Sequence, residues 1–276
     1  MRRKYHFCVS YTKHLEKYLQ EEAIRYNVAE NLLAFDLYDD DMAYHLFIKR
    51  FPWHRFDSFY SIEYSQKEME EAEWFYIHST THKIPWIYEE DAYEKTCMHR
   101  RFFSKDPYYR HKTQIGEPTS SRRVKWTSRQ FFAGPETSDD LLFCSEKAKS
   151  ILGDGWKGLN YLRVKKENSS KYIPDLYQLF FDKQLPFEAL QGGRCIKCRY
   201  CGKPIIRIKE DEADLRIKRG FLNDSKCVFS TGDVLTGEIL GFSTYSINIV
   251  PRDFYLFCMK SKINKGLLFN PVMLID

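Results

Sequence analysis

The sequence lacks the features that mark several large classes of protein. Nowhere does it approach the roughly 20 consecutive apolar residues that a membrane-spanning helix needs. The chain begins Met1-Arg2-Arg3-Lys4, but the residues that follow, 5–11, are too few and too polar for the apolar core of a signal peptide. A glycine-rich phosphate loop is absent as well. We therefore expect a protein that has no membrane span and works in the cytoplasm.

A recognisable set of catalytic residues is also missing. Two pairs of neighbours, His78 with Ser79 and Cys97 with His99, have the residue types of a base and a nucleophile. Side chains one or two positions apart seldom point at each other, and neither pair has a third group to orient the base. We rank an enzyme last among the possible functions and expect that the protein is not one.

Apolar and aromatic residues, in contrast, are plentiful. Of the 276 residues, 43% are hydrophobic and 16% are aromatic, which indicates a folded protein with a sizeable core. Eight cysteines in a chain without a signal peptide point to the reducing cytoplasm.

Positive charge is concentrated in one stretch. The formal net charge is +5, yet residues 99–129 hold nine Lys and Arg against two acids, so the rest of the chain is slightly acidic. Such a run is either a solvated loop or a docking surface for an acidic partner or for phosphate. It belongs to a long irregular connection, 83–135, and long ordered loops usually have a function. The residue types that dominate interface energetics predict partner binding through Trp86, Tyr88, Tyr108, Tyr109, Arg122, Arg123 and Trp126.

The stretch Cys198-x-x-Cys201-Gly202 has the spacing of a zinc knuckle. Its two thiolates can converge on one tetrahedral ion, and glycine permits the sharp turn after the second ligand. Pro204 then starts a strand that carries Ile205, Ile206 and Ile208. We predict one structural zinc ion held by four thiolates, from Cys195, Cys198, Cys201 and Cys227.

Other interpretations of these cysteines remain open. Cys97 with His99, or Cys258, are alternative ligands, and the two knuckle thiols are free if the metal site has decayed. An iron–sulfur cluster is disfavoured because no further cysteine followed by proline comes soon after Cys201. A thioredoxin-like redox pair is disfavoured because Pro204 follows closely and no helix starts at Cys198.

Local patterns predict both helices and strands. Apolar residues at helical spacing mark a helix over 13–26, and Ser65-Gln66-Lys67-Glu68 is a capping box that begins another. The acidic triplet Asp39-Asp40-Asp41 either binds a cation or, as we prefer, caps a helix over 42–49. Further helices are expected to follow Ser145 and Pro251. The predicted strands cover residues 5–10, 59–64, 74–77, 141–144, 157–164, 175–180 and 247–250.

Two segments repeat one pattern. Residues 157–164 and 265–272 share Lys-Gly-Leu-x-aromatic-x-x-Val, and each follows a strand and a short helix. Coincidence is the alternative, but the shared element order favours an internal duplication. We predict an α+β fold with two related strand–helix–strand lobes, a long irregular insertion and a zinc-knuckle-like turn between the lobes. The predicted divisions are an amino-terminal strand and helices packed on the rest (1–58), the first lobe (59–190), and the knuckle with the second lobe (191–276).

Four short motifs together resemble a known family. They are Ser-x-x-Glu-x-x-x-Ala-x-Trp at 65–74, Cys144-Ser145 with Lys157-Gly158-Leu159, the CxxCG at 198–202, and Gly266-Leu267-x-Phe269-x-Pro271-Val272. In these the chain is similar, over residues 59–276, to bacterial double-CXXCG motif proteins and related immunity proteins of polymorphic toxin systems. The resemblance implies a protein that neutralises a toxin by binding it. This chain has one CxxCG where the family name implies two.

Two functions from different classes are therefore considered. The first is a non-enzymatic immunity-type protein that binds a cognate toxin. A toxin with a basic site would meet the acidic residues of 39–41 or 68–73, whereas the basic stretch suits an acidic toxin. The second is a zinc-ribbon protein that binds nucleic acid through residues 100–129 and stacks bases on Tyr108, Tyr109 and Trp126. The salt dependence of binding separates the two.

Overall fold

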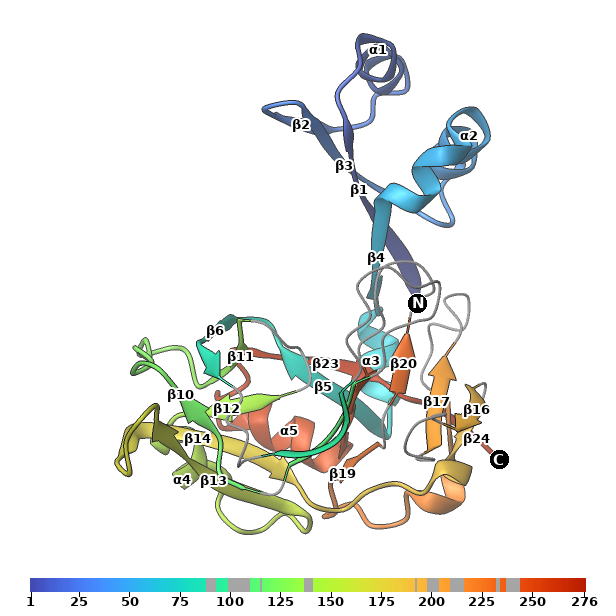
Figure 1. Ribbon diagram of the computed structural model, residues 1–276. Helices are drawn as coiled ribbons and strands as arrows, with labels where there is room; N and C mark the ends of the chain where they lie inside the picture. Colours follow the sequence, from blue (N-terminus) through green and yellow to red (C-terminus); the bar gives the residue numbers. More distant parts are fainter. Residues whose placement is uncertain are drawn as a thin grey trace. The chain divides into compact units, whose positions relative to one another are not determined.

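The computed structural model divides the chain into two units, residues 1–71 (unit 1) and 72–276 (unit 2) (Figure 1). The sequence places its first boundary earlier, at 58/59. Both units combine helices with sheets, so the predicted α+β class is confirmed. Within the described ranges, no helix has the length and apolar character needed to cross a membrane. The structure describes residues 1–87, 93–98, 110–114, 116–136, 141–191, 193–197, 204–208, 216–231, 234–236 and 244–276.

Unit 1 is built on a four-stranded antiparallel sheet of order β2-β3-β1-β4. Helices α1 and α2 each connect two strands that have a third strand between them. This βαββαβ connectivity is the split β-α-β arrangement of ferredoxin-like folds. The elements are β1 (Arg2–Ser10), α1 (Lys13–Glu21), β2 (Tyr26–Ala29), β3 (Leu32–Tyr38), α2 (Met42–Arg50), the 3₁₀-helix η1 (Pro52–Asp57), β4 (Ser58–Glu63) and α3 (Gln66–Glu71).

The two faces of this sheet differ because side chains alternate along each strand. Phe7 of β1 and Phe35 of β3 share one face and are buried together with Leu15 of α1 and Phe47 of α2. The ring centroids of the three phenylalanines lie 4.9, 5.0 and 5.1 Å apart. The opposite face carries polar side chains, among them His6 and Asp36, next to small or apolar ones such as Ala34.

Helix α1 is shorter than the predicted 13–26. It starts as expected, with the Thr12 side chain as its cap, but it ends at Glu21. Ala23 has a φ of +54°, a left-handed conformation that turns the chain out of the helix. Ile24 is then buried in the core, and Tyr26 begins β2. The β2–β3 hairpin therefore begins at Tyr26, the last residue of the predicted helix, and continues through residues for which no element was predicted.

The predicted capping box is confirmed. The amide of Ser65 donates to Glu68 Oε2 at 2.7 Å, and the amide of Glu68 donates to Ser65 Oγ at 3.3 Å, at the start of α3. The acidic triplet only partly follows its prediction. Asp41 occupies the N-cap position of α2, but its side chain makes no capping hydrogen bond.

Unit 2 contains short strands and the helices α4 and α5. Its largest sheet has the order β6-β11-β12-β14-β13-β10-β7, and a second has the order β19-β22-β5-β23. The smaller sheets are β15-β18-β24, β16-β17-β20-β21 and β8-β9. The elements are β5 (Trp74–Ser79), β6 (His82–Ile84), β7 (Trp86–Ile87), β8 (Tyr93–Met98), β9 (Arg110–Gln114), β10 (Thr119–Ser120), β11 (Phe132–Pro135), β12 (Leu142–Cys144), α4 (Glu146–Leu152), β13 (Leu159–Lys166), β14 (Tyr172–Phe181), η3 (Phe187–Ala189), β15 (Leu190–Gln191), β16 (Gly193–Lys197), β17 (Pro204–Ile208), β18 (Arg216–Lys218), η4 (Arg219–Phe221), β19 (Phe229–Ser230), β20 (Val234–Thr236), β21 (Thr244–Tyr245), β22 (Asn248–Pro251), α5 (Arg252–Lys260), β23 (Leu267–Pro271) and β24 (Met273–Ile275).

Two strand–helix–strand segments of unit 2 have the same arrangement. One is β12-α4-β13 and the other is β22-α5-β23, so the predicted element order is confirmed in both stretches. In each segment a third strand lies antiparallel between the two, β14 in the first and β5 in the second. A further antiparallel strand flanks each, with β11 beside β12 and β19 beside β22. The strand β5 precedes the first segment along the chain, yet it lies between β22 and β23 of the second segment.

The hydrogen-bond registers of the two segments also correspond. In both, one residue of the middle strand pairs with the position four after the leucine of the pattern and, on its other side, with the residue two before the helix. These residues are Tyr177, between Arg163 and Cys144, and Phe75, between Pro271 and Val250.

The glycines of the repeated pattern explain why it recurs. Gly158 and Gly266 have φ values of +86° and +98°, which residues with a Cβ rarely adopt. A Cβ on Gly158 would lie 2.6 Å from Val228 O, and one on Gly266 would come still closer to Phe132 O. Both glycines therefore allow the backbone of another strand segment to approach closely.

Candidate functional site

The predicted zinc knuckle lies mostly beyond the described residues. Cys198 and Cys201 are outside them, and Cys195 is placed by the backbone of β16. The strand predicted after the knuckle is confirmed as β17, which pairs antiparallel with β16. The structure thus places the strands that flank the knuckle, while the zinc ion stays a prediction.

The remaining candidate ligands are separate from these strands in sequence. Cys227, the fourth predicted ligand, is a free thiol just before β19, with 2% of its surface exposed. Cys258 lies buried in α5, where burial raises the pKa of its thiol to about 12. Cys97 is placed by the backbone of β8, and His99 is outside the described residues. Within the described ranges, no three His, Cys, Asp or Glu side chains are grouped to hold a metal ion.

Three of the predicted partner-binding residues are described with their side chains. Arg122 and Arg123 are exposed, and Trp126 is half-buried, all in the irregular segment after β10. Trp86 is placed by the backbone of β7. Tyr88, Tyr108 and Tyr109 lie outside the described residues.

Residues 121–131, between β10 and β11, form no regular element but are firmly anchored together with β10. The hydroxyl of Ser120, which is fully buried, donates to Pro85 O at 2.5 Å. The indole N–H of Trp126 donates to Asp175 O at 2.6 Å, and its ring packs against a core cluster that includes Ile84. Trp126 therefore holds the segment in place rather than standing out from it.

Lys83 provides a further anchor from β6. Its ammonium donates to Lys125 O at 2.8 Å and to Gln130 Oε1 at 2.6 Å, and it lies 4.7 Å from the centroid of the Trp126 ring. Partial burial lowers the pKa of Lys83. These contacts tie both ends of residues 125–130 to the sheet.

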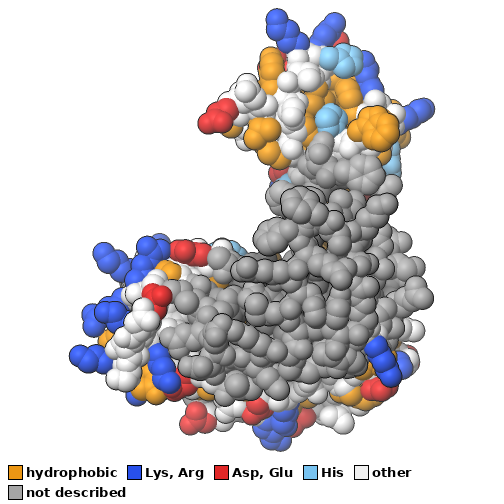
Figure 2. Space-filling view, in the orientation of Figure 1, with side chains coloured by type: hydrophobic (Ala, Val, Ile, Leu, Met, Phe, Trp, Pro, Cys, Tyr) orange, Lys and Arg blue, Asp and Glu red, His pale blue; other side chains and the backbone are white. Residues whose placement is uncertain are grey.

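The side chains displayed by this segment are cationic. We define Arg122, Arg123, Lys125 and Arg129, all exposed, as the basic loop. Arg122 pairs with Glu136 at 2.8 Å, whereas the other three have no ion-pair partner among the described residues. In Figure 2, Lys and Arg side chains gather at the end of unit 2 where β10, β13 and β14 lie in Figure 1.

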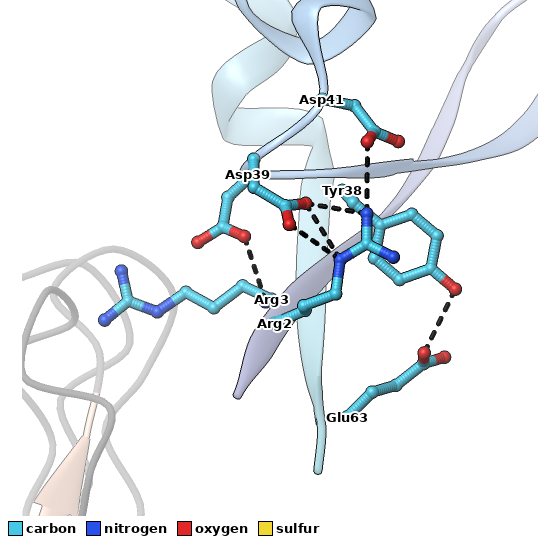
Figure 3. A network of polar contacts seen from close by, with 7 residues as sticks. Arg2, Arg3, Tyr38, Asp39, Asp41 and Glu63 are labelled. Atoms are coloured by element: carbon cyan, nitrogen blue, oxygen red, sulfur yellow. Dashed lines mark hydrogen bonds and ion pairs between the residues drawn. The ribbon is translucent and has the colours of Figure 1, made fainter. Parts of the chain in front are cut away.

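The acidic triplet, in contrast, is bound within unit 1 (Figure 3). Arg2 Nε donates to Asp40 Oδ2 at 2.8 Å, and Arg2 Nη2 donates to Asp41 Oδ1 at 3.1 Å. The amide of Arg3 donates to Asp39 Oδ1 at 3.1 Å. The hydrogen bond from Arg2 also lowers the pKa of Asp40. These carboxylates are held by the protein itself.

The second acidic region, residues 68–73, is also paired. Glu68 binds the amino-terminal ammonium of Met1 as well as Ser65, and these hydrogen bonds lower its pKa to about 2. Glu73 of unit 2 pairs with Arg219 at 2.6 Å. Neither predicted acidic surface therefore offers a free set of carboxylates to a basic toxin.

A serine, a histidine and an aspartate meet on the polar face of the unit 1 sheet. His6 Nδ1 lies 2.8 Å from Asp36 Oδ1, and His6 Nε2 lies 2.7 Å from Ser61 Oγ. The order matches a nucleophile, a base and an orienting carboxylate. However, strand β1 is hydrogen-bonded to a strand on each side, so its backbone amides are already engaged. The Lys4 ammonium is engaged as well, because it binds Asp36 at 3.0 Å. These donors therefore do not form an oxyanion hole. We interpret the set as a cross-strand polar network, one that sequence spacing could not reveal.

The pair His78 and Ser79 does not converge. The two are consecutive residues of β5 and face opposite sides of the strand. The hydroxyl of Ser79 is buried and donates to Thr81 O at 2.8 Å, while His78 Nδ1 lies 3.5 Å from Asn270 Nδ2.

The chain matches no family model, and the comparisons with curated proteins and with solved structures give no match either.

Proposed function

We propose that this protein is a non-enzymatic, cytoplasmic immunity-type protein that binds and neutralises a cognate toxin through the basic loop. The observation that carries the proposal is that the acidic regions and the basic loop differ in their ion pairs. Carboxylates of the predicted acidic surfaces are paired with cations of the same chain, whereas Arg123, Lys125 and Arg129 have no ion-pair partner among the described residues. An acidic surface on the toxin is the complementary partner, because opposite potentials steer association and fix its register.

The anchoring of the basic loop supports the same proposal. Binding costs less conformational entropy when the contact surface is already ordered. The loop is fixed to the sheet by contacts of Trp126, Ser120 and Lys83. Its cationic side chains therefore extend from a backbone that is ordered before binding. Neutralisation of a toxin, as opposed to binding alone, rests on the resemblance of the short motifs to the double-CXXCG and immunity proteins.

The alternative is a zinc-ribbon protein that binds nucleic acid. Its support is the same exposed positive charge. The half-buried indole of Trp126 weighs against it, because that ring is engaged with the core and with Lys83 instead of being open for base stacking. We place this function second.

The proposal extends to the metal and to the architecture. A structural zinc held by Cys195, Cys198, Cys201 and Cys227 would fasten the turn between β16 and β17. The matching registers of β12-α4-β13 and β22-α5-β23 support two related lobes that arose by duplication.

Charge reversal in the basic loop tests the proposed function. The double variant Arg123→Glu and Arg129→Glu should weaken binding to the toxin at least tenfold, about 1.4 kcal/mol, and reduce protection when toxin and variant are co-expressed. Both side chains are exposed, so the thermal unfolding of the variant should match that of the wild type.

The matched control is Lys218→Glu with Lys260→Glu, two exposed cations elsewhere in unit 2. It changes the net charge equally and should leave binding intact. Equal loss in both variants would show a general charge effect and contradict the role of the basic loop. Binding of single-stranded DNA at physiological salt, in the absence of any protein partner, would favour the alternative function.

A further inference from the structure

The two most exposed large hydrophobic side chains of the described residues lie close together in sequence, in unit 1. Trp53 is 81% exposed and Met42 is 71% exposed, and Leu46, which lies between them, is 42% exposed. Large apolar side chains are normally covered, so such a grouping indicates an interaction surface. Figure 2 shows hydrophobic side chains at the surface of unit 1, interspersed with Lys, Arg and His.

These residues belong to α2 and η1. Phe47 and Phe51 point inward, and their ring centroids lie 5.3 Å apart in the core of unit 1. Met42 and Leu46 are four positions apart, so they are neighbours on the exposed side of α2. Trp53 follows in η1, just beyond the end of the helix. We call Met42, Leu46 and Trp53 the outer stripe.

The surroundings of the outer stripe are basic. Residues 1–71 hold thirteen Asp and Glu against ten Lys and Arg, yet residues 42–56 contain three of these cations and no acid. Lys49 is exposed between Leu46 and Trp53 along the chain. The Arg50 guanidinium instead lies over the ring of the buried Tyr18, 5.1 Å from its centroid. A complementary surface therefore needs both apolar contact and negative charge.

We propose that the outer stripe is a second protein-binding surface, which inserts into an apolar groove with an acidic rim on a partner protein. Recognition of this kind reads side chains at positions i, i+4 and i+7 of a helix, which are Met42, Leu46 and Lys49 of α2, and here Trp53 of η1 follows the helix. Tryptophan is among the residue types most enriched at binding hot spots. The surface belongs to unit 1, so it is distinct from the basic loop of unit 2, and its partner need not be the toxin.

Two other occupants are disfavoured. A second copy related by a two-fold axis would place the same cationic stripe opposite itself, which opposes association. Single-stranded nucleic acid would match the charge, but its successive bases call for several stacking surfaces, and the outer stripe offers one aromatic ring.

Photo-crosslinking locates the partner. A benzophenone amino acid is introduced at Leu46 in the cells that produce the protein, and the adduct is identified by mass spectrometry. The matched control is the same substitution at Leu256, a residue of unit 2 that is 46% exposed. We expect an adduct at Leu46, absent at Leu256, with a protein that has acidic residues around an apolar groove.

Affinity measurements with the purified crosslinked protein complete the test. Trp53→Ala should weaken binding by about 30-fold or more, because an alanine substitution at a hot spot commonly costs that much. Lys49→Glu should slow association and flatten its salt dependence. Leu256→Ala should change neither. Trp53 is so exposed that its variant should unfold at the wild-type temperature.

Several results would overturn the inference. They are an adduct with unit 2 of the same chain, with a second copy or with nucleic acid; no adduct at Leu46 beyond that at Leu256; and full affinity in Trp53→Ala. The charge-reversal variant of the basic loop is measured in parallel with the toxin. If toxin binding does not depend on the basic loop but the outer stripe binds its partner as expected, only the proposed function fails. If toxin binding depends on the basic loop but the outer stripe binds nothing, only this inference fails.

Discussion

Replacing Gly266 with alanine should destabilise unit 2 markedly. The substitution has two separate costs. At a φ of +98° a residue with a Cβ is strained, and the new methyl group would overlap the carbonyl oxygen of Phe132, which belongs to the backbone and cannot rotate away. Strain of this kind costs about 1–3 kcal/mol and overpacking a further 1–3 kcal/mol, so we expect a loss of roughly 2–6 kcal/mol.

Three other glycines separate the two costs. Gly153 has a φ of +60°, but no atom lies within 4 Å of an added Cβ, so Gly153→Ala should show the strain alone, about 1–3 kcal/mol. Gly155 has neither strain nor neighbours, and Gly155→Ala should stay within about 0.5 kcal/mol of the wild type. Gly158 has both, like Gly266, and should resemble it if the two segments are equivalent.

Urea denaturation followed by tryptophan fluorescence measures these differences. Four of the five tryptophans, Trp74, Trp86, Trp126 and Trp156, belong to unit 2, so the signal reports mainly on that unit. The expected order of stability is Gly155→Ala, then Gly153→Ala, then the variants of Gly158 and Gly266. Variants of Gly158 and Gly266 that are as stable as Gly155→Ala would refute the close backbone approach and the reasoning built on it.

Two further predictions concern metal and pH. Replacing Cys198 or Cys201 with serine should lower the free energy of unfolding by several kcal/mol, because structural zinc binding is coupled to folding; less than about a tenth of an equivalent of zinc in protein purified without a histidine tag would contradict the site. The hydrogen bond from Tyr177 to Glu146 raises the pKa of the phenol to about 12. Because the pKa is higher in the folded state, this bond stabilises fully below about pH 10 and is lost as the pH rises toward 12. Tyr177→Phe should remove this decrease in stability at alkaline pH. If the urea midpoints of the two proteins change equally with pH between pH 8 and 11, the prediction is refuted.

Local features of the fold were predictable from the sequence. The capping box at Ser65 and Glu68 depends on residues three apart, and the strand–helix–strand order around Gly158 and Gly266 depends on short periodic patterns. The end of α1 was predicted wrongly, because Ala23 adopts a positive φ without the glycine that usually signals one. The alternation of Leu33, Phe35 and Leu37 is a local signal for β3.

Long-range features could not be predicted in this way. Pairing of β5 with β22 joins segments from opposite ends of unit 2, and no local pattern encodes it. The same limit hid the meeting of His6, Asp36 and Ser61, which come from three strands. The residue type of Trp126 indicated partner binding, but it did not reveal that the indole anchors its own segment. The outer stripe was missed, although residues 42–56 have a visible lack of acids.

The position of β5 has a consequence for how the chain folds during synthesis. Ile77 pairs with Asn248, so β5 leaves the ribosome long before its neighbours in the sheet. At about 5–20 residues per second, its edges wait for many seconds without their native partners. Unit 1 has all of its strands early and can fold first, whereas unit 2 must wait for its last segment. An exposed, apolar strand such as Trp74–Ser79 is an aggregation hazard during that interval, which makes the nascent chain a candidate client for chaperones.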